Sequence, residues 1–157
     1  MRRIQALIYG LIFGFTIVIS SCNTAMIYNQ TEDIEGTWNR YDSAVFHVPI
    51  EDTAALYNFY INIRNNNDYR YSNLYVFFHS IFPNGNKTHD TLEFILADKR
   101  GKWLGKGIGE IKENNILIRK NMRFPVQGEY TFKIEQGMRS DDLKGIEDIG
   151  ISIEKSN

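Results

Sequence analysis

The sequence predicts an all-β protein: a single antiparallel β-sandwich of about eight strands, jelly-roll or immunoglobulin-like, after a signal peptide and a short tether. Three observations support this prediction. Apolar and polar residues alternate with a period of two over most of the chain. Clusters of Asn, Asp, Gly and Pro separate the alternating runs. Aromatic residues, which favour strands, make up 13% of the 157 residues.

Residues 1–21 have the pattern of a secretory signal peptide. Arg2 and Arg3 give a positive start, residues 4–19 form an almost uninterrupted apolar run, and small residues follow. A membrane-spanning helix needs about 20 apolar residues. The run is therefore short for a span and fits a cleaved signal, with an uncleaved anchor helix as the alternative.

The end of this segment, Ile19-Ser20-Ser21-Cys22, resembles a bacterial lipobox. In proteins of that type the cysteine is acylated and becomes the new N-terminus, so the resemblance implies membrane lipid as a partner through acylated Cys22. Without Arg2 and Arg3 the chain keeps 16 of its 18 basic residues against 19 acidic ones, a net charge of −3. Attachment is therefore expected to depend on the lipid and not on a basic patch.

Residues 22–35 show no clear period and are interpreted as the lipidated N-terminus and a tether, and residues 36–157 as the β-sandwich domain. In residues 57–64, for example, Tyr57, Phe59, Ile61 and Ile63 alternate with more polar residues. Residues 138–146 are the one weak helix candidate. The expected strands are residues 44–50, 56–64, 74–79, 91–96, 102–111, 116–122, 130–135 and 149–154.

Composition excludes several classes of function. The chain has 18 Lys and Arg against 19 Asp and Glu, so it lacks the basic excess of a nucleic-acid-binding protein. Its single cysteine excludes an internal disulfide and a cysteine-based zinc site. His47, His79 and His89 have no second ligand at a metal-binding spacing. We therefore expect no metal, no cofactor, no small-molecule substrate and no enzymatic activity.

Glycines along the expected strand at 102–111 indicate one candidate surface. Gly105, Gly107 and Gly109 alternate on the same face as Trp103, which would leave a shallow trough. The trough either accepts a glycan or a partner's chain, or is filled by aromatic side chains of a neighbouring strand or the other sheet.

Two successive runs each present aromatic and polar side chains on one side, which indicates a second candidate surface. If the runs form a hairpin around the loop at 65–71, these side chains make one exposed platform. Aromatic residues and Arg are enriched at protein interfaces. The alternative is that a second sheet or the tether covers the platform. The candidate partner-binding residues are Tyr60, Asn62, Arg64, Tyr75 and Phe77, with His79 beside them and Trp103 from the glycine-rich segment.

Several segments in order resemble a known family. They are residues 57–69 (YNFYINIRNNNDY), 71–74, 90–94, 101–107 (GKWLGKG), 122–125, 135–136 and 143–150. Together with the lipobox, this order resembles the GldH family of gliding-motility lipoproteins of the Bacteroidota over roughly residues 22–155. The Asn-rich turn and the Trp-Leu-Gly segment are the specific parts of the resemblance.

The resemblance implies a periplasm-facing lipoprotein needed for gliding and for the linked type IX secretion of adhesins and enzymes. We expect a non-enzymatic adaptor whose partners are other gliding and secretion envelope proteins. The alternative is a carbohydrate-binding envelope lipoprotein, because jelly rolls with exposed aromatics often bind glycans. Residues 23–27 hold no acidic residue, which favours the periplasmic side. The outer membrane is expected before the inner one.

Three short segments resemble the Asp-Ser/Thr-aliphatic pattern of O-glycosylation in that phylum. The candidate acceptors are Ser43, Thr53 and Thr91, each of which follows an Asp. Ser43 and Thr53 are expected before Thr91, because Thr91 lies within an expected strand.

Overall fold

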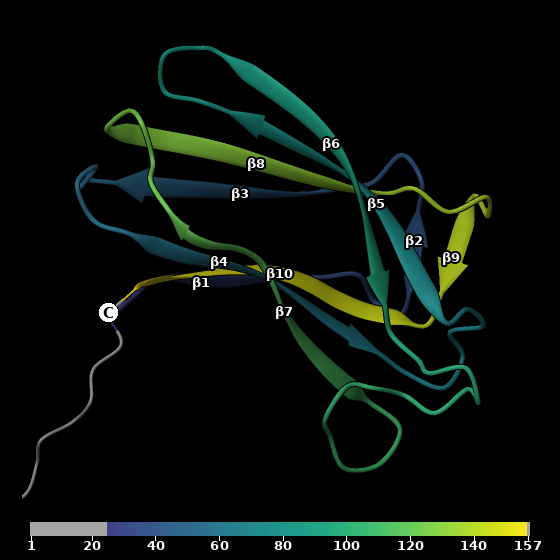
Figure 1. Cartoon of the computed structure of the whole chain (residues 1–157). Coiled ribbons are helices and arrows are strands. Elements are labelled where there is room, and N and C mark those ends of the chain that lie inside the picture. The colour runs from purple at the N-terminus through teal and green to yellow at the C-terminus, as the bar shows by residue number, and fades with distance from the viewer. Residues whose placement is uncertain (1–24, 157) are drawn as a thin grey trace, which may run out of the picture.

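The computed structural model describes residues 25–156, which form ten β-strands and no helix (Figure 1). The expected signal peptide at 1–21 and the expected lipidation site Cys22 lie outside these residues. The strands are β1 (Met26–Asp33), β2 (Thr37–Asn39), β3 (Ser43–Ile50), β4 (Tyr57–Asn65), β5 (Asn73–Ile81), β6 (Lys87–Ile95), β7 (Lys112–Met122), β8 (Gly128–Gln136), β9 (Asp142–Lys144) and β10 (Ile146–Lys155).

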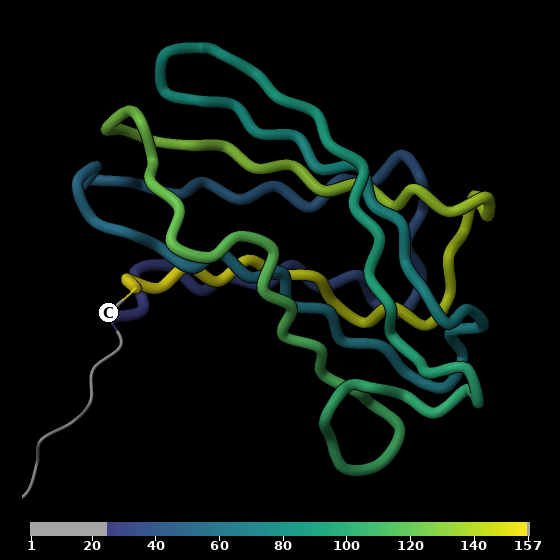
Figure 2. Tube along the Cα trace, viewed as in Figure 1, coloured from purple at the N-terminus to yellow at the C-terminus, as the bar shows by residue number. Residues whose placement is uncertain are grey.

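Two four-stranded antiparallel sheets form the body of the protein, one above the other in the trace of Figure 2. Sheet 1 has the strand order β1-β10-β4-β7, and sheet 2 has the order β3-β8-β5-β6. The short strands β2 and β9 pair with each other as a separate two-stranded sheet. The predicted all-β fold with antiparallel, sandwich-like sheets is confirmed.

The core lies between the inner faces of the two sheets and follows the alternation in the sequence. In β4 every second residue from Tyr57 to Ile63 is at most 2% exposed. The rings of Phe59, Phe78 and Phe132 meet across the two sheets with centroids 5.1 to 5.9 Å apart. Such aromatic contacts add to the stability gained from burying apolar area.

Strand β10 lies between β1 and β4 and is buried on both of its faces. Ile149, Ile151 and Ile153 face the core and are fully buried. The alternate residues Gly150 and Ser152 face outward and are covered by side chains of the neighbouring strands. Because they are covered in this way, the outward-facing positions of β10 hold small residues, Gly150 and Ser152.

The predicted tether is wrong for residues 26–33, which form the edge strand β1. This strand pairs with β10 from Met26 to Asp33. Only Tyr28 is buried in β1, at 7% exposure, so the segment has no apolar alternation to reveal it. Backbone hydrogen bonds with β10, which is more than a hundred residues away in the sequence, hold this segment at the edge of the sheet.

Two other predicted elements are also wrong. Residues 102–111 form a loop with two isolated bridges instead of a strand. Gly107 and Gly109 have φ angles of +149° and +78°, which a regular strand does not allow. The helix candidate at 138–146 contains strand β9, whose Leu143 pairs with the fully buried Trp38 of β2.

Gly145 lies where three segments of the chain meet. Its N–H donates to the carbonyl oxygen of Gly36 at 2.9 Å, and its own carbonyl accepts the N–H of Asn66 at 2.9 Å. Its φ is +86°, and a Cβ atom there would lie 2.1 Å from the backbone nitrogen of Tyr69. Only glycine fits this junction.

We expect Gly145→Ala to lower the free energy of unfolding by about 3 kcal/mol or more, because it adds a backbone clash to left-handed strain. The control is Gly85→Ala. Gly85 has nearly the same φ, +84°, but nothing lies within 4 Å of an added Cβ. Gly85→Ala should lower the free energy of unfolding by only about 1–2 kcal/mol. Urea unfolding measures both, and equal losses in the two variants would contradict the packing role of Gly145.

Candidate functional site

The outer face of sheet 1 presents rows of mainly polar side chains, which we call the polar face. Residues opposite one another in paired strands lie on the same side of a sheet, so the register aligns side chains of β1, β10, β4 and β7 in rows. The rows are Asp33, Asp148, Arg64 and Glu113; Thr31, Gly150, Asn62 and Asn115; and Asn29, Ser152, Tyr60 and Leu117.

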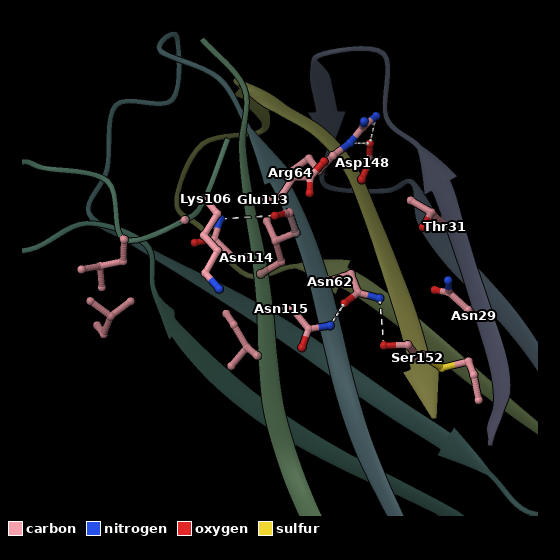
Figure 3. A pocket seen from close by; sticks show the side chains of 16 residues that line it. Asn29, Thr31, Asn62, Arg64, Lys106, Glu113, Asn114, Asn115, Asp148 and Ser152 are labelled. Atoms are coloured by element: carbon pink, nitrogen blue, oxygen red, sulfur yellow. Dashed lines mark hydrogen bonds and ion pairs between the residues drawn. The ribbon is translucent and has the colours of Figure 1, made fainter. Parts of the chain in front are cut away.

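Asn62 is at the centre of a chain of side-chain hydrogen bonds that crosses three strands (Figure 3). Asn115 Nδ2 donates to Asn62 Oδ1 at 2.6 Å, and Asn62 Nδ2 donates to Ser152 Oγ at 3.1 Å. One row away, the Tyr60 hydroxyl donates to Glu154 Oε1 at 2.7 Å, which raises the pKa of Tyr60. These bonds fix the orientation of the amide and phenol groups at the surface.

Arg64 is the one cation in its row of the polar face, among Asp148, Asp33 and Glu113. Its guanidinium forms an ion pair with Asp148, whose side chain is 5% exposed, while 47% of the Arg64 side chain remains exposed. Burial is the main cause that raises the pKa of Asp148. The nearby charges of Asp33 and Glu113 add to the rise, and Arg64 opposes it.

Gly150 lies in the middle row, between Thr31 and Asn62. A Cβ atom at this position would lie 2.6 Å from the Gln30 carbonyl oxygen and 2.8 Å from Thr31 Oγ1. The absence of a side chain therefore lets β1 approach β10 closely.

The polar face is part of a groove of about 910 Å³. Beyond β7, a second, more apolar wall is formed by Ile95 at the end of β6 and by Leu104 and Lys106 of the loop between β6 and β7. Backbone hydrogen bonds between Lys106 and Glu113, 2.7 and 2.9 Å long, attach this loop to β7. Figure 3 shows Lys106 and Asn114 on one side of β7 and the polar face on the other.

The structure places the residues of the predicted platform on two different sheets. Tyr60, Asn62 and Arg64 share one face of β4, as the alternation predicts. Strands β4 and β5 belong to different sheets, so the chain after Asn65 crosses from one sheet to the other and no hairpin forms. The residues of β5, Tyr75 and Phe77, lie on the outer face of sheet 2, each 37% exposed.

Trp103 lies in the loop between β6 and β7 and packs against the Asn-rich turn. Its Nε1 donates to Asn67 Oδ1 at 3.2 Å, and its ring centroid lies 6.3 Å from that of Tyr69. Because Gly105, Gly107 and Gly109 do not alternate along a strand, the predicted trough beside Trp103 is wrong.

Sequence reasoning missed the contributions of β1, β7 and β10 to the polar face. The alternation of small and polar residues with Ile149, Ile151 and Ile153 was a usable signal for β10. No signal in the sequence paired Asn62 with Asn115 or Arg64 with Asp148, because the partners lie 53 and 84 residues apart.

Comparison with known proteins identifies the family of this chain. The family model described as GldH lipoprotein matches residues 26–153, nearly the whole described part of the chain. The chain belongs to the GldH lipoprotein family. Its resemblance to this family is thereby confirmed.

Two relatives of the GldH family cover almost the whole chain. A "gliding motility lipoprotein GldH homolog" of Christiangramia forsetii is 40% identical over 154 residues, which is 93% of this chain and 94% of the relative. The "gliding motility lipoprotein GldH" of Flavobacterium johnsoniae is 28% identical over 155 residues, or 94% of this chain and 96% of that protein. As a member of this family, the chain has a role in gliding motility.

Two solved structures show a distant resemblance to this GldH family member. Latent PorU of Porphyromonas gingivalis aligns with a TM-score of 0.36 at 11% identity, over 82% of this chain and 12% of PorU. A carbohydrate-binding module, CBM35 of Cellvibrio japonicus Abf62, aligns with a TM-score of 0.33 at 11% identity, over 83% of this chain and 99% of the module. Similarities this low carry no argument about function.

Two absences hold for residues 25–156. No helix there is long and apolar enough to cross a membrane. No group of three or more His, Cys, Asp or Glu in this part of the GldH chain could hold a metal ion.

The three candidate acceptors of O-glycosylation remain predictions. Ser43 begins β3, and its Oγ donates to Glu135 at 3.1 Å. Thr53 lies in the turn between β3 and β4, next to Asp52, whose carboxylate accepts two backbone N–H groups. Thr91 lies within β6, as expected, and is exposed.

We expect Arg64→Ala to destabilise the fold in a pH-dependent way, because it removes the partner of buried Asp148. Near pH 7 the loss should be about 2 kcal/mol, less than for a fully buried pair since the guanidinium is half exposed. The pKa of Asp148 is already raised in the folded protein. Removing Arg64 raises it further, so the loss relative to the unchanged chain should grow as the pH rises above about 4.

Urea unfolding near pH 4 and pH 7 measures this effect. In the Asp148→Asn background, the loss caused by Arg64→Ala should be the same at both pH values, because no carboxyl group at position 148 is left to titrate. A loss in Arg64→Ala that is the same at both pH values would contradict the electrostatic role of the pair.

Proposed function

We propose that this chain is a non-enzymatic, lipid-anchored adaptor of the gliding machinery and the linked type IX secretion system. It binds another envelope protein through the groove over the polar face. Membership of the GldH family and the names of two relatives support the gliding part of the proposal. The groove of about 910 Å³, with polar side chains already oriented by hydrogen bonds, is the observation that carries the adaptor part.

The chemistry of the groove suits a polypeptide. Asn62 and Asn115 offer amide donors and acceptors, and Arg64 offers an exposed guanidinium. Ile95 and Leu104, which are 55% and 56% exposed, provide apolar area on the other wall. These walls lie on opposite sides of the edge strand β7, so a partner segment that crosses β7 would contact the polar face with polar side chains and Ile95 and Leu104 with apolar ones.

The groups in the groove favour binding over catalysis. Ser152 is 2% exposed, and the side chain hydrogen-bonded to its hydroxyl is the amide of Asn62, which is not a base. Asp148 is enclosed and paired with Arg64. No histidine or cysteine lines the groove among the described residues. These features support a non-enzymatic role, since nucleophilic catalysis needs a base next to an accessible nucleophile.

The proposed anchor places the groove near the membrane. Cys22 precedes β1 by a few residues, and β1 contributes Asn29 and Thr31 to the wall of the groove. We propose that acylated Cys22 holds the domain on the periplasmic side, at the outer membrane before the inner one. A tethered domain meets partners in the same membrane at a raised effective concentration.

Crosslinking in cells, pulldown of the tagged full-length chain and mass spectrometry test the adaptor proposal. We expect other gliding and secretion envelope proteins to be enriched. Asn115→Arg should remove this enrichment, because it places a long charged side chain on the exposed floor of the groove. The control is Asn86→Arg, an exposed position in the β5–β6 turn outside the groove.

Equal enrichment with both variants would contradict binding in the groove. Recovery of peptidoglycan or polysaccharide alone would replace the adaptor proposal with the carbohydrate-binding alternative.

Intact mass spectrometry of the protein from its own cells tests the anchor. We expect a chain that begins at Cys22 and carries acyl groups, and in Cys22→Ala an unacylated chain that retains residues 1–21. The control Ser21→Ala keeps a small residue before the cysteine and should be processed normally. A full-length, unmodified natural chain would identify residues 1–21 as an uncleaved anchor instead.

A further inference from the structure

All three histidines of the chain lie on the outer face of sheet 2, and two of them face each other. His79 of β5 and His89 of β6 are directly paired in the strand register. Their Nδ1 atoms lie 3.1 Å apart, and their ring centroids are 4.4 Å apart. His47 lies on the other edge strand, β3, with its Nδ1 near Glu129 and Thr131.

Glu135 of β8 fixes the tautomer of His79. Its Oε2 lies 3.1 Å from His79 Nε2. The Lys133 ammonium, 2.8 Å from Oε1, is the main cause that lowers the pKa of Glu135, so this carboxylate is ionised at neutral pH and only accepts hydrogen bonds. His79 Nε2 must therefore carry the hydrogen that it donates. In the neutral ring this leaves the lone pair on Nδ1, directed at His89.

The second ring is also held in place. The ring of Phe77 stacks on His89 with centroids 5.7 Å apart and an interplanar angle of 27°. The two imidazoles meet through their Nδ1 atoms, so one hydrogen is shared between two lone-pair sites. The side chain of His79 is 32% exposed and His89 is exposed, so solutes reach these atoms.

The spacing of the two nitrogens is that of two ligands on one metal ion. Metal–nitrogen bonds of about 2.0–2.1 Å at a tetrahedral angle place two imidazole nitrogens about 3.3 Å apart. A histidine ligand that donates its other N–H to a carboxylate is the usual arrangement around bound metals. His79 with Glu135 has this arrangement before any metal binds.

We propose that His79 and His89 are the two protein ligands of a site for a divalent transition-metal ion. Imidazole ligands suit copper, nickel and zinc, and Cu²⁺ binds most tightly in this series. Glu135 is a positioning residue that orients His79. Because the described residues offer no group of three or more His, Cys, Asp or Glu for a metal, water fills the other coordination positions. The site is separate from the groove and does not depend on the proposed adaptor function.

Titration of the untagged full-length chain in detergent with Cu²⁺ alone, followed by calorimetry and electron paramagnetic resonance, tests the site. We expect one saturable Cu²⁺ per chain, with coupling to two nitrogens in the spectrum. His79→Gln and His89→Gln should each weaken binding at least about tenfold. The control is His47→Gln, on the same face of the sheet, which should bind like the unchanged chain.

Absence of a saturable site, or an equal loss in His47→Gln, would overturn the proposal. Circular dichroism and urea unfolding confirm that each variant is folded. Because the three histidines lie on an exposed sheet face, Gln should fit at each position without repacking of the core.

Glu135→Ala tests the positioning role. It should weaken Cu²⁺ binding about tenfold while the coupling to two nitrogens remains, because both ligands are still present. Glu135→Gln keeps a carbonyl oxygen that accepts from His79 Nε2 and should restore most of the affinity. If Glu135→Ala binds Cu²⁺ as tightly as the unchanged chain, Glu135 does not position His79.

Discussion

The pairing of β10 with two strands at once is the constraint on which the rest of the structure depends. Among residues 25–156 this strand is the last, and it lies between β1, the first, and β4. Its inner residues Ile149, Ile151 and Ile153 fill the centre of the core. Every row of the polar face also crosses it. The edge strand β1 has no other partner in its sheet, so neither the sheet nor the groove is complete until the C-terminal residues are in place.

How much the sequence predicts depends on whether the determining interaction is local. Strand β4 was predictable because its alternation reports one buried face directly. Strand β1 was not, since a single buried residue, Tyr28, leaves no period and long-range hydrogen bonds place the strand. For residues 102–111 the opposite holds: a local pattern is present, but the strand that it predicts does not form. Their alternating glycines resembled a strand, whereas Gly107 and Gly109 serve left-handed turns of a loop.

The same distinction between local and long-range interactions applies to the candidate surfaces. That Tyr60, Asn62 and Arg64 share a face is a property of one strand, and the sequence predicted it. Which side chains join them is decided by register between strands far apart in the chain, such as the pairing of Arg64 with Asp148. The facing of His79 and His89 is likewise set by the β5–β6 register. Spacing rules for metal ligands within one strand had no means to detect it.

The position of β1 has a mechanical consequence. If Cys22 bears the lipid, any load between the membrane and a partner in the groove passes along β1, which is joined to the rest of sheet 1 only through β10. A pull along an antiparallel strand stretches its hydrogen bonds together, in shear, whereas a pull across it breaks them one by one. The domain therefore resists traction from its anchor along the direction of β1 more strongly than across it, a property that suits a part of a machine that moves cells.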